Sequence, residues 1–361
     1  REQASRTAGN AIFVTLCYFV LIFLFELTSA RAFINSQTTD TVIAEMGTTY
    51  LRIITAFSLG TLGYMCFEKI VMGTGKTMIT MICQLAGAIT NIVLDPIMIY
   101  GLFRCPAMGM AGAAWATVIG QFVSLIVIAV VYFKKGVGIE SNIRYLKPER
   151  KTLKSIYSIG VPAIVMQILT PIMSYAMNLI LGAISVSAVT AYGVYYKLQN
   201  FIFMPGYGLN NASIPIISYN YGAKNKERVS QTIRYGLIYI SVIMLVGIVL
   251  LQLFARPIVG IFSVTEESHQ LCVLALRTIT CGFFFAGANI ILQGVCQALG
   301  KGGYSLIISL LRFVVLALPL AWALSAAENA ASIVWISLPV AEAGACVVAV
   351  LLTRRTYRRR I

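Results

Sequence analysis

The chain has 361 residues, of which 58% are hydrophobic and only 11% are charged, and its formal net charge is +15. Its mean hydropathy is +0.83. Soluble globular chains carry about 25% charged residues. The composition therefore excludes an ordinary soluble enzyme and indicates a protein that lies within a membrane.

Ten apolar stretches are long enough to cross a bilayer, which takes about 20 helical residues. They are continuously apolar, whereas the strands of a membrane barrel alternate apolar and polar side chains. We therefore expect an all-α polytopic membrane fold with ten transmembrane helices. The expected spans are Gly9–Phe25, Met46–Met72, Met78–Tyr100, Gly109–Phe133, Ile156–Gly182, Ala188–Ser218, Thr232–Phe254, His269–Leu299, Gly303–Leu324 and Ala330–Leu352.

The 28 lysines and arginines are distributed unevenly around these spans. Twenty fall in the loops and tails on the side of both termini, three on the opposite side and five within spans. Basic loops stay in the cytoplasm, so we expect a multi-pass protein of the cell (cytoplasmic) membrane with both termini inside. Anionic membrane lipids, and not nucleic acid, are then the expected partner of the positive charge.

The sequence contains few residues that could bind a metal or catalyse a reaction. The eight cysteines include no C-x-x-C pair, and His269 is the single histidine of the sequence. No Ser/His, paired-Asp or H-E-x-x-H arrangement is present, so neither a metal site, nor another cofactor, nor an enzyme is expected.

The chain also resembles itself at a shift of 225 residues, which indicates a repeat with the same membrane orientation in both halves. The first copy would lack about 75 residues at its start, so we expect an N-terminally truncated chain. The matched positions are Arg31 with Arg256, Arg52 with Arg277, and Gly75-Lys76 with Gly300-Lys301. The expected parts are an N-terminal bundle of four helices at 1–134, a cytoplasmic connecting loop at 135–155, a six-helix C-terminal bundle at 156–353 and a basic tail at 354–361.

Four strings together resemble the multidrug and toxic compound extrusion (MATE) family. They are Tyr195-Tyr196-Lys197-Leu198-Gln199-Asn200-Phe201-Ile202-Phe203-Met204-Pro205, Gly160-Val161-Pro162, Asn91-Ile92-Val93-Leu94-Asp95-Pro96 and Gly109-Met110-Ala111-Gly112-Ala113-Ala114-Trp115-Ala116-Thr117. The resemblance implies twelve helices in two bundles related by a pseudo-twofold axis, of which this chain would supply helices three to twelve. It further implies a monomeric exporter of cationic, amphipathic small molecules, coupled to Na⁺ or H⁺ by antiport.

Asp95 is the main candidate for ion coupling, with Asn91 one helical turn before it on the same face. In the family that the chain resembles, the equivalent Asn and Asp line a cation or proton site together with a Thr that corresponds to Thr117. The residues alone leave a second interpretation open, in which Asp95 caps a kink at Pro96 near the membrane surface.

Other polar residues within the spans are candidates for a central cavity. Lys197 lies nine residues inside its span, where it either faces a cavity or bonds to helix-end carbonyls or to Tyr192. The amide side chains that line a cavity or join helices are Gln167, Asn178, Asn289 and Gln293.

Arg312 and Glu342 both lie about 14 Å from the inner face of the membrane, from their positions along the two last spans. Two unpaired charges at that depth are costly, so we expect an ion pair between them. A structural role for this pair is favoured over a role in transport. A secondary active exporter is the leading interpretation of the whole chain. The alternatives are a lipid-linked oligosaccharide flippase, which would need several cationic cavity residues, and a passive channel.

Overall fold

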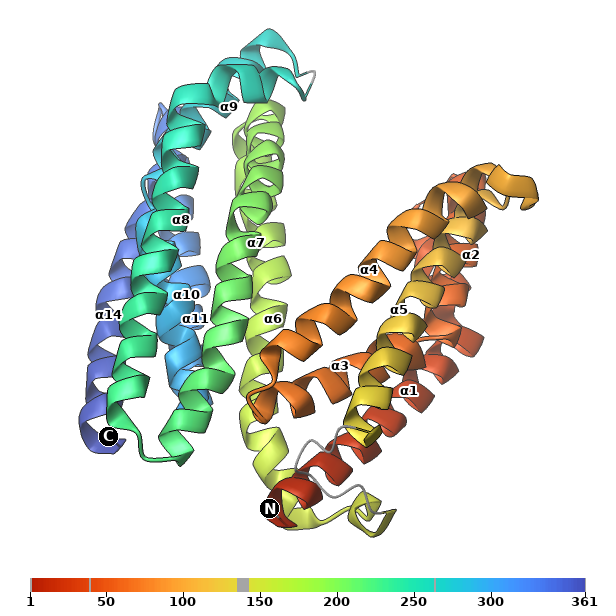
Figure 1. Ribbon diagram of the computed structural model, residues 1–361. Coiled ribbons are helices and arrows are strands. Elements are labelled where there is room, and N and C mark those ends of the chain that lie inside the picture. The colour runs from red at the N-terminus through yellow and green to blue at the C-terminus, as the bar shows by residue number, and fades with distance from the viewer. Residues whose placement is uncertain (1, 39, 135–142, 263, 361) are drawn as a thin grey trace. The chain divides into compact units, whose positions relative to one another are not determined.

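The computed structural model describes residues 2–38, 40–134, 143–262 and 264–360, and within these ranges the chain is helical and has no strand (Figure 1). Among the described residues, seven helices are long and apolar enough to cross a membrane, or nine spans if each of two bent helix pairs counts as one. These correspond to nine of the ten expected spans. Helix α7 (Val186–Gly222) is long enough but does not meet the same test of apolar composition.

Two compact units divide the chain, Arg1–Ile156 and Tyr157–Ile361. The expected connecting loop at 135–155 lies in the first unit, except that residues 135–142 fall outside the described ranges. Unit 1 contains α1 (Glu2–Gln37), α2 (Thr41–Ala56), α3 (Leu59–Gly73), α4 (Thr77–Tyr100), η1 (Leu102–Arg104), α5 (Gly109–Lys134), η2 (Ile143–Leu146) and the start of α6 (Arg150–Ile184).

Unit 2 contains the rest of α6 and the helices that follow it. They are α7, α8 (Lys226–Gly260), α9 (Glu266–Thr280), α10 (Phe283–Ala298), α11 (Gly302–Leu310), η3 (Leu311–Ala317), α12 (Leu318–Ser325), α13 (Ala330–Ile333), η4 (Val334–Ile336) and α14 (Ser337–Arg360). Side-chain caps mark several helix starts, since Ser185 caps α7, Asn225 caps α8 and Thr265 caps α9.

The expected repeat is visible in the backbone of both units. The pair α2 and α3 bends by 47° at Phe57, and the pair α9 and α10 bends by 50° at Gly282, which is 225 residues later. Gly75 and Gly300, the same distance apart, both adopt left-handed backbones with φ of 83° and 70°. The matched Gly75-Lys76 and Gly300-Lys301 of the sequence therefore mark a similar turn in each unit.

Helices α4 and α5 of unit 1 approach closely because glycines remove the side chains between them. A Cβ atom on Gly120 would lie 2.7 Å from the carbonyl oxygen of Gly87, and one on Gly112 would lie 2.4 Å from that of Met98. No larger residue fits at these contacts without moving the helices. The glycines thus bring the polar side chains of α4 and α5 within reach of each other.

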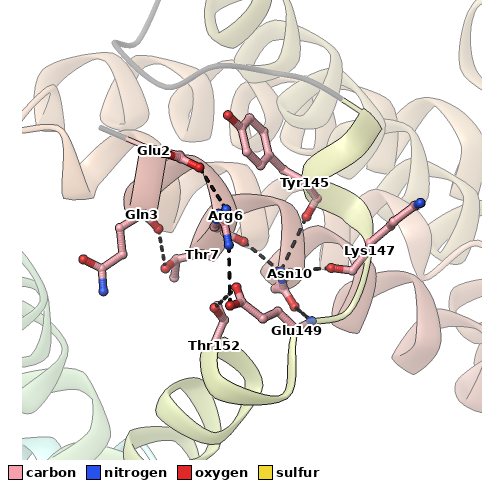
Figure 2. Close-up of polar contacts among 9 residues, drawn as sticks. All are labelled: Glu2, Gln3, Arg6, Thr7, Asn10, Tyr145, Lys147, Glu149 and Thr152. Atoms are coloured by element: carbon pink, nitrogen blue, oxygen red, sulfur yellow. Dashed lines mark hydrogen bonds and ion pairs between the residues drawn. The ribbon is translucent and has the colours of Figure 1, made fainter.

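Asn10 on α1 fixes the segment that leads into α6, within unit 1 (Figure 2). Its Nδ2 donates to the carbonyl oxygens of Tyr145 and Lys147 at 3.5 and 3.4 Å, and its Oδ1 accepts from the backbone N–H of Glu149 at 2.9 Å. Asn10 is 1% exposed. Arg6 adds an ion pair with Glu149 at 3.5 Å, so one turn of α1 holds the entry to α6.

In unit 2, α10 is the central helix and packs against α7, α8, α11 and α14. The core around it is aromatic and aliphatic, with Phe203 and Phe283 in edge-to-face contact at 4.8 Å between ring centroids. This packing surrounds the polar residues of the last two spans.

Candidate functional site

Asn91 and Thr117 are brought together in unit 1 by the close approach of α4 and α5. The Nδ2 of Asn91 donates to the Oγ1 of Thr117 at 3.5 Å, and Thr117 donates in turn to the carbonyl oxygen of Ala113 at 2.9 Å. Both residues are half-buried. Two of the three residues expected for ion coupling therefore make direct contact.

Asp95 lies one turn beyond Asn91 on α4 and is half-buried. Helix α4 continues through Pro96 to Tyr100. Within the described residues no hydrogen bond or ion pair is found for the Asp95 carboxylate, so the structure shows no cap at Pro96. The carboxylate lies on the same helix face as the amide of Asn91.

Gln121 is a polar residue of unit 1 that the sequence analysis did not select. It lies one turn after Thr117 on α5, and its Oε1 is buried without a hydrogen-bond partner among the described residues. A buried acceptor without a donor costs free energy. Gln121 could have been selected from the sequence, because it lies four residues after Thr117 and so on the same face of α5. It extends the polar stripe on that helix by one turn.

The expected ion pair between Arg312 and Glu342 is present in unit 2. The Nε of Arg312 donates to the Oε1 of Glu342 at 2.5 Å. Arg312 lies in η3, a π-helical segment ahead of Pro319, which has no N–H to continue regular α-helical bonding. Such π-helical insertions are frequent at functional sites because they turn a side chain out of the regular helix pattern.

Asn289 holds the other side of the Glu342 carboxylate. Its Nδ2 donates to the Oε2 of Glu342 at 2.9 Å and to the backbone oxygen of the same residue at 3.0 Å. Asn289 has 0% of its surface exposed. Two roles were expected for Asn289, lining a cavity or joining helices, and these hydrogen bonds join α10 to α14 while neither cavity described below includes Asn289.

A cavity of about 660 Å³ opens beside this ion pair, within unit 2. Six carboxamide side chains are the largest group in its wall, which also contains aliphatic residues, two aromatic rings and Arg312. Its lining residues are Ala163, Met166, Gln167, Thr170, Pro171, Asn200, Tyr207, Asn210, Asn211, Ile214, Ile290, Gln293, Gln297, Ser309, Arg312 and Phe313. A smaller cavity of about 50 Å³ shares Arg312 with it and adds Glu342. Arg312 and Phe313 lie close together, with the guanidinium 4.8 Å from the ring centroid.

The structure brings Gln167, Gln293 and Arg312 to the larger cavity and Glu342 to the smaller one, but not the other three candidates, Asn178, Lys197 and Asn289. Lys197 is exposed and lies with its Nζ 5.8 Å from the ring centroid of Phe262. Lys197 lines neither of these two cavities of unit 2, and its role stays a prediction. Asn178 is exposed and also lies outside both cavities.

Five cavity residues of α7 were not selected as candidates: Asn200, Tyr207, Asn210, Asn211 and Ile214. Spacings of seven and then four residues place Asn200, Tyr207 and Asn211 on one face of a helix. That spacing was available in the sequence. Gln293, on α10, has one unsatisfied polar group. Its Oε1 accepts a hydrogen bond from Ser309 at 3.2 Å, whereas its Nε2 is buried without a partner in the described part of the chain.

A helical multi-pass fold with a polar cavity among its spanning helices is typical of a membrane transporter. A family model described as MatE matches residues 1–97 and 162–323. The chain belongs to the MatE family.

Relatives and solved structures agree with this assignment. The multidrug export protein MepA of Staphylococcus aureus (strain MSSA476) is 27% identical over 312 residues, which cover 86% of this chain and 67% of that protein. A multidrug resistance MATE family transporter of the MOP superfamily, in an outward-facing conformation, superposes with a TM-score of 0.89 at 23% identity, over 98% of this chain and 79% of the other.

A MOP superfamily transporter from Pyrococcus furiosus Vc1 (DSM3638), described by the reverse polarity of its binding pocket, superposes with a TM-score of 0.90 at 23% identity. The superposition covers 99% of this chain and 80% of that one. At these identities the structural neighbours show the shared fold.

Proposed function

We propose that the chain is the core of a secondary active exporter for cationic, amphipathic drugs, working by alternating access in the cell membrane with both termini in the cytoplasm. The observation that carries the proposal is the large cavity of unit 2. Its volume of about 660 Å³ is in the range of pockets for drug-sized ligands. Membership of the MatE family and similarity to a protein named as a multidrug exporter support it.

The wall of the cavity suits a cation with an apolar body. Amide oxygens accept hydrogen bonds, and the faces of Tyr207 and Phe313 attract positive charge. Arg312 is the only fully charged residue among those that line this cavity, and Glu342 already offsets it. A cationic guest therefore meets little net repulsion.

Coupling to Na⁺ or H⁺ is proposed at Asp95, with Asn91 and Thr117 as neutral partners. A half-buried carboxylate without a partner can take up a proton or a hard cation. The bound ion would favour one transport state over the other through its different affinity for the two. No organic cofactor or resident metal is needed for this cycle, and a monomer suffices for it.

The flippase alternative receives less support from the cavity. A pyrophosphate-linked cargo calls for several cations, and only Arg312 lines the cavity while Lys197 lies over Phe262. A passive channel would give flux that does not depend on an ion gradient.

The test measures efflux of a cationic dye from cells that express the protein. Asp95→Asn should abolish gradient-driven efflux at unchanged expression. Asp40→Asn is the matched control, because Asp40 caps α2 through Val42 and Ile43 and Asn caps equally well. Unchanged efflux in Asp95→Asn removes Asp95 from the mechanism, and efflux that survives collapse of the ion gradients identifies a channel.

A further inference from the structure

A second hollow of unit 2 is a groove of about 470 Å³ between α7 and α8. It shares no lining residue with the cavity proposed for cargo. Along α8 it extends from Arg228 to Tyr239, which is about 16 Å at 1.5 Å per residue. The groove is therefore elongated along two helices of the bundle.

The two ends of the groove differ in chemistry. Arg228, Gln231 and Thr232 line the end next to the turn between the helices. Leu209 and Tyr239 line the opposite end. The groove thus changes from cationic and polar to apolar along its length, as a binding site for an amphipathic molecule would.

Small residues form the floor between these ends. A Cβ atom on Gly236 would lie 3.7 Å from the Oγ of Ser213 and 3.5 Å from a methyl group of Ile291, which closes the floor with α10. Ser213 donates its hydroxyl hydrogen to the carbonyl oxygen of Leu209 at 2.8 Å. Because that donor is already satisfied, a hydrocarbon chain can lie over it without leaving a polar group unpaired.

Arg228 provides a positive charge that the chain does not neutralise. It is exposed and forms no ion pair with any described residue. The adjacent Glu227 instead accepts a hydrogen bond from Gln231 at 3.1 Å. Lys224 lies just before α8 and Lys226 is its first residue, and both add to the positive potential at this end.

We propose that this groove binds one anionic phospholipid, with its phosphate at Arg228 and one acyl chain along Ser213, Gly236 and Tyr239. Such a lipid supplies, in one molecule, an anion for the guanidinium and a chain for the apolar end. Helix α8 is itself among the helices long and apolar enough to span a membrane, and Ile216, Tyr235 and Tyr239 of the groove are exposed.

The experiment is native mass spectrometry of the purified chain in detergent, titrated with phosphatidylglycerol or phosphatidylcholine. We expect one phosphatidylglycerol to bind more tightly than phosphatidylcholine. Arg228→Gln should weaken phosphatidylglycerol binding about five-fold, as expected for one basic side chain at an anionic headgroup. Since Arg228 is exposed, this variant keeps the fold.

Arg234→Gln is the matched control, because Arg234 is an exposed arginine of the same helix that does not line the groove. It should leave lipid binding unchanged. Ala212→Trp, which fills the groove, should weaken binding of both lipids, and glycerol 3-phosphate, which has no acyl chain, should not compete. Equal losses in the two arginine variants, an unchanged Arg228→Gln, or competition by glycerol 3-phosphate would each overturn the proposal.

Discussion

Arg312 and Glu342 form an ion pair inside unit 2, with 6% and 15% of their side chains exposed. A charge left alone in such a place is costly, whereas a pair can be replaced by apolar residues of similar size at little cost. Arg312→Met or Glu342→Gln alone should therefore lower the free energy of unfolding by roughly 3–5 kcal/mol.

The double variant should recover most of that loss, as measured by titration with a denaturing detergent. Additive losses in the double variant would mean that the two side chains contribute independently and that the ion pair is not the reason for their burial.

The amide of Asn289 completes this cluster from α10. Asn289→Ala removes both hydrogen bonds to Glu342 and should cost about 1–3 kcal/mol, because the carboxylate then keeps an unpaired oxygen in the core. Asn178→Ala serves as the control at an exposed position and should change stability by less than about 0.5 kcal/mol. The same detergent titration compares the two, and similar losses would contradict the role given to Asn289.

The ion pair could be predicted because distance along a helix can be counted from the sequence. Which face of α7 lines the cavity could not be predicted in this way. Lys197 and Asn200 are only about 60° apart around that helix. Only Asn200 lines the cavity. In a membrane the lipid is as apolar as the protein interior, so the contrast between an inner apolar face and an outer polar face is lost. The sequence therefore identifies spans and depths better than it identifies cavity walls.

The repeat was also predictable, because turns require particular residues. Gly75 has a φ of 83°, and no atom lies within 4 Å of the place where a Cβ would be. Gly75→Ala should therefore cost about 1 kcal/mol through backbone strain alone. Gly73→Ala, two residues earlier at the end of α3 and equally open to solvent or lipid, should be neutral or stabilising. A comparison of melting temperatures in detergent checks both, and equal effects would contradict the strain at Gly75.

Asn10 holds the entry to α6 through backbone groups of Tyr145, Lys147 and Glu149 (Figure 2). Asn10→Ala should release this segment and increase the rate of tryptic cleavage after Arg144 several-fold, because proteases cut backbone that can leave its hydrogen bonds. Thr7→Ala, one turn earlier and exposed, bonds only within α1 and is the control. Peptide mapping by mass spectrometry follows the cleavage, and an unchanged rate in Asn10→Ala would show that other contacts hold the segment.

Gln167 and Asn178 lie on one face of α6, eleven residues apart, and only Gln167 lines the large cavity. Gln167→Trp should reduce the cavity volume and impair export of bulky dyes about ten-fold or more, since a cavity that is too small rejects a large guest through steric overlap. Export of the smallest transported cations should be much less affected. Asn178→Trp introduces the same side chain on the same helix outside the cavity and should preserve the full cargo profile. Dye efflux from cells, measured over a series of cations of increasing size, distinguishes the two variants. Equal impairment by both substitutions would mean that the cargo route is not the cavity of unit 2 and runs along the face of α6 instead.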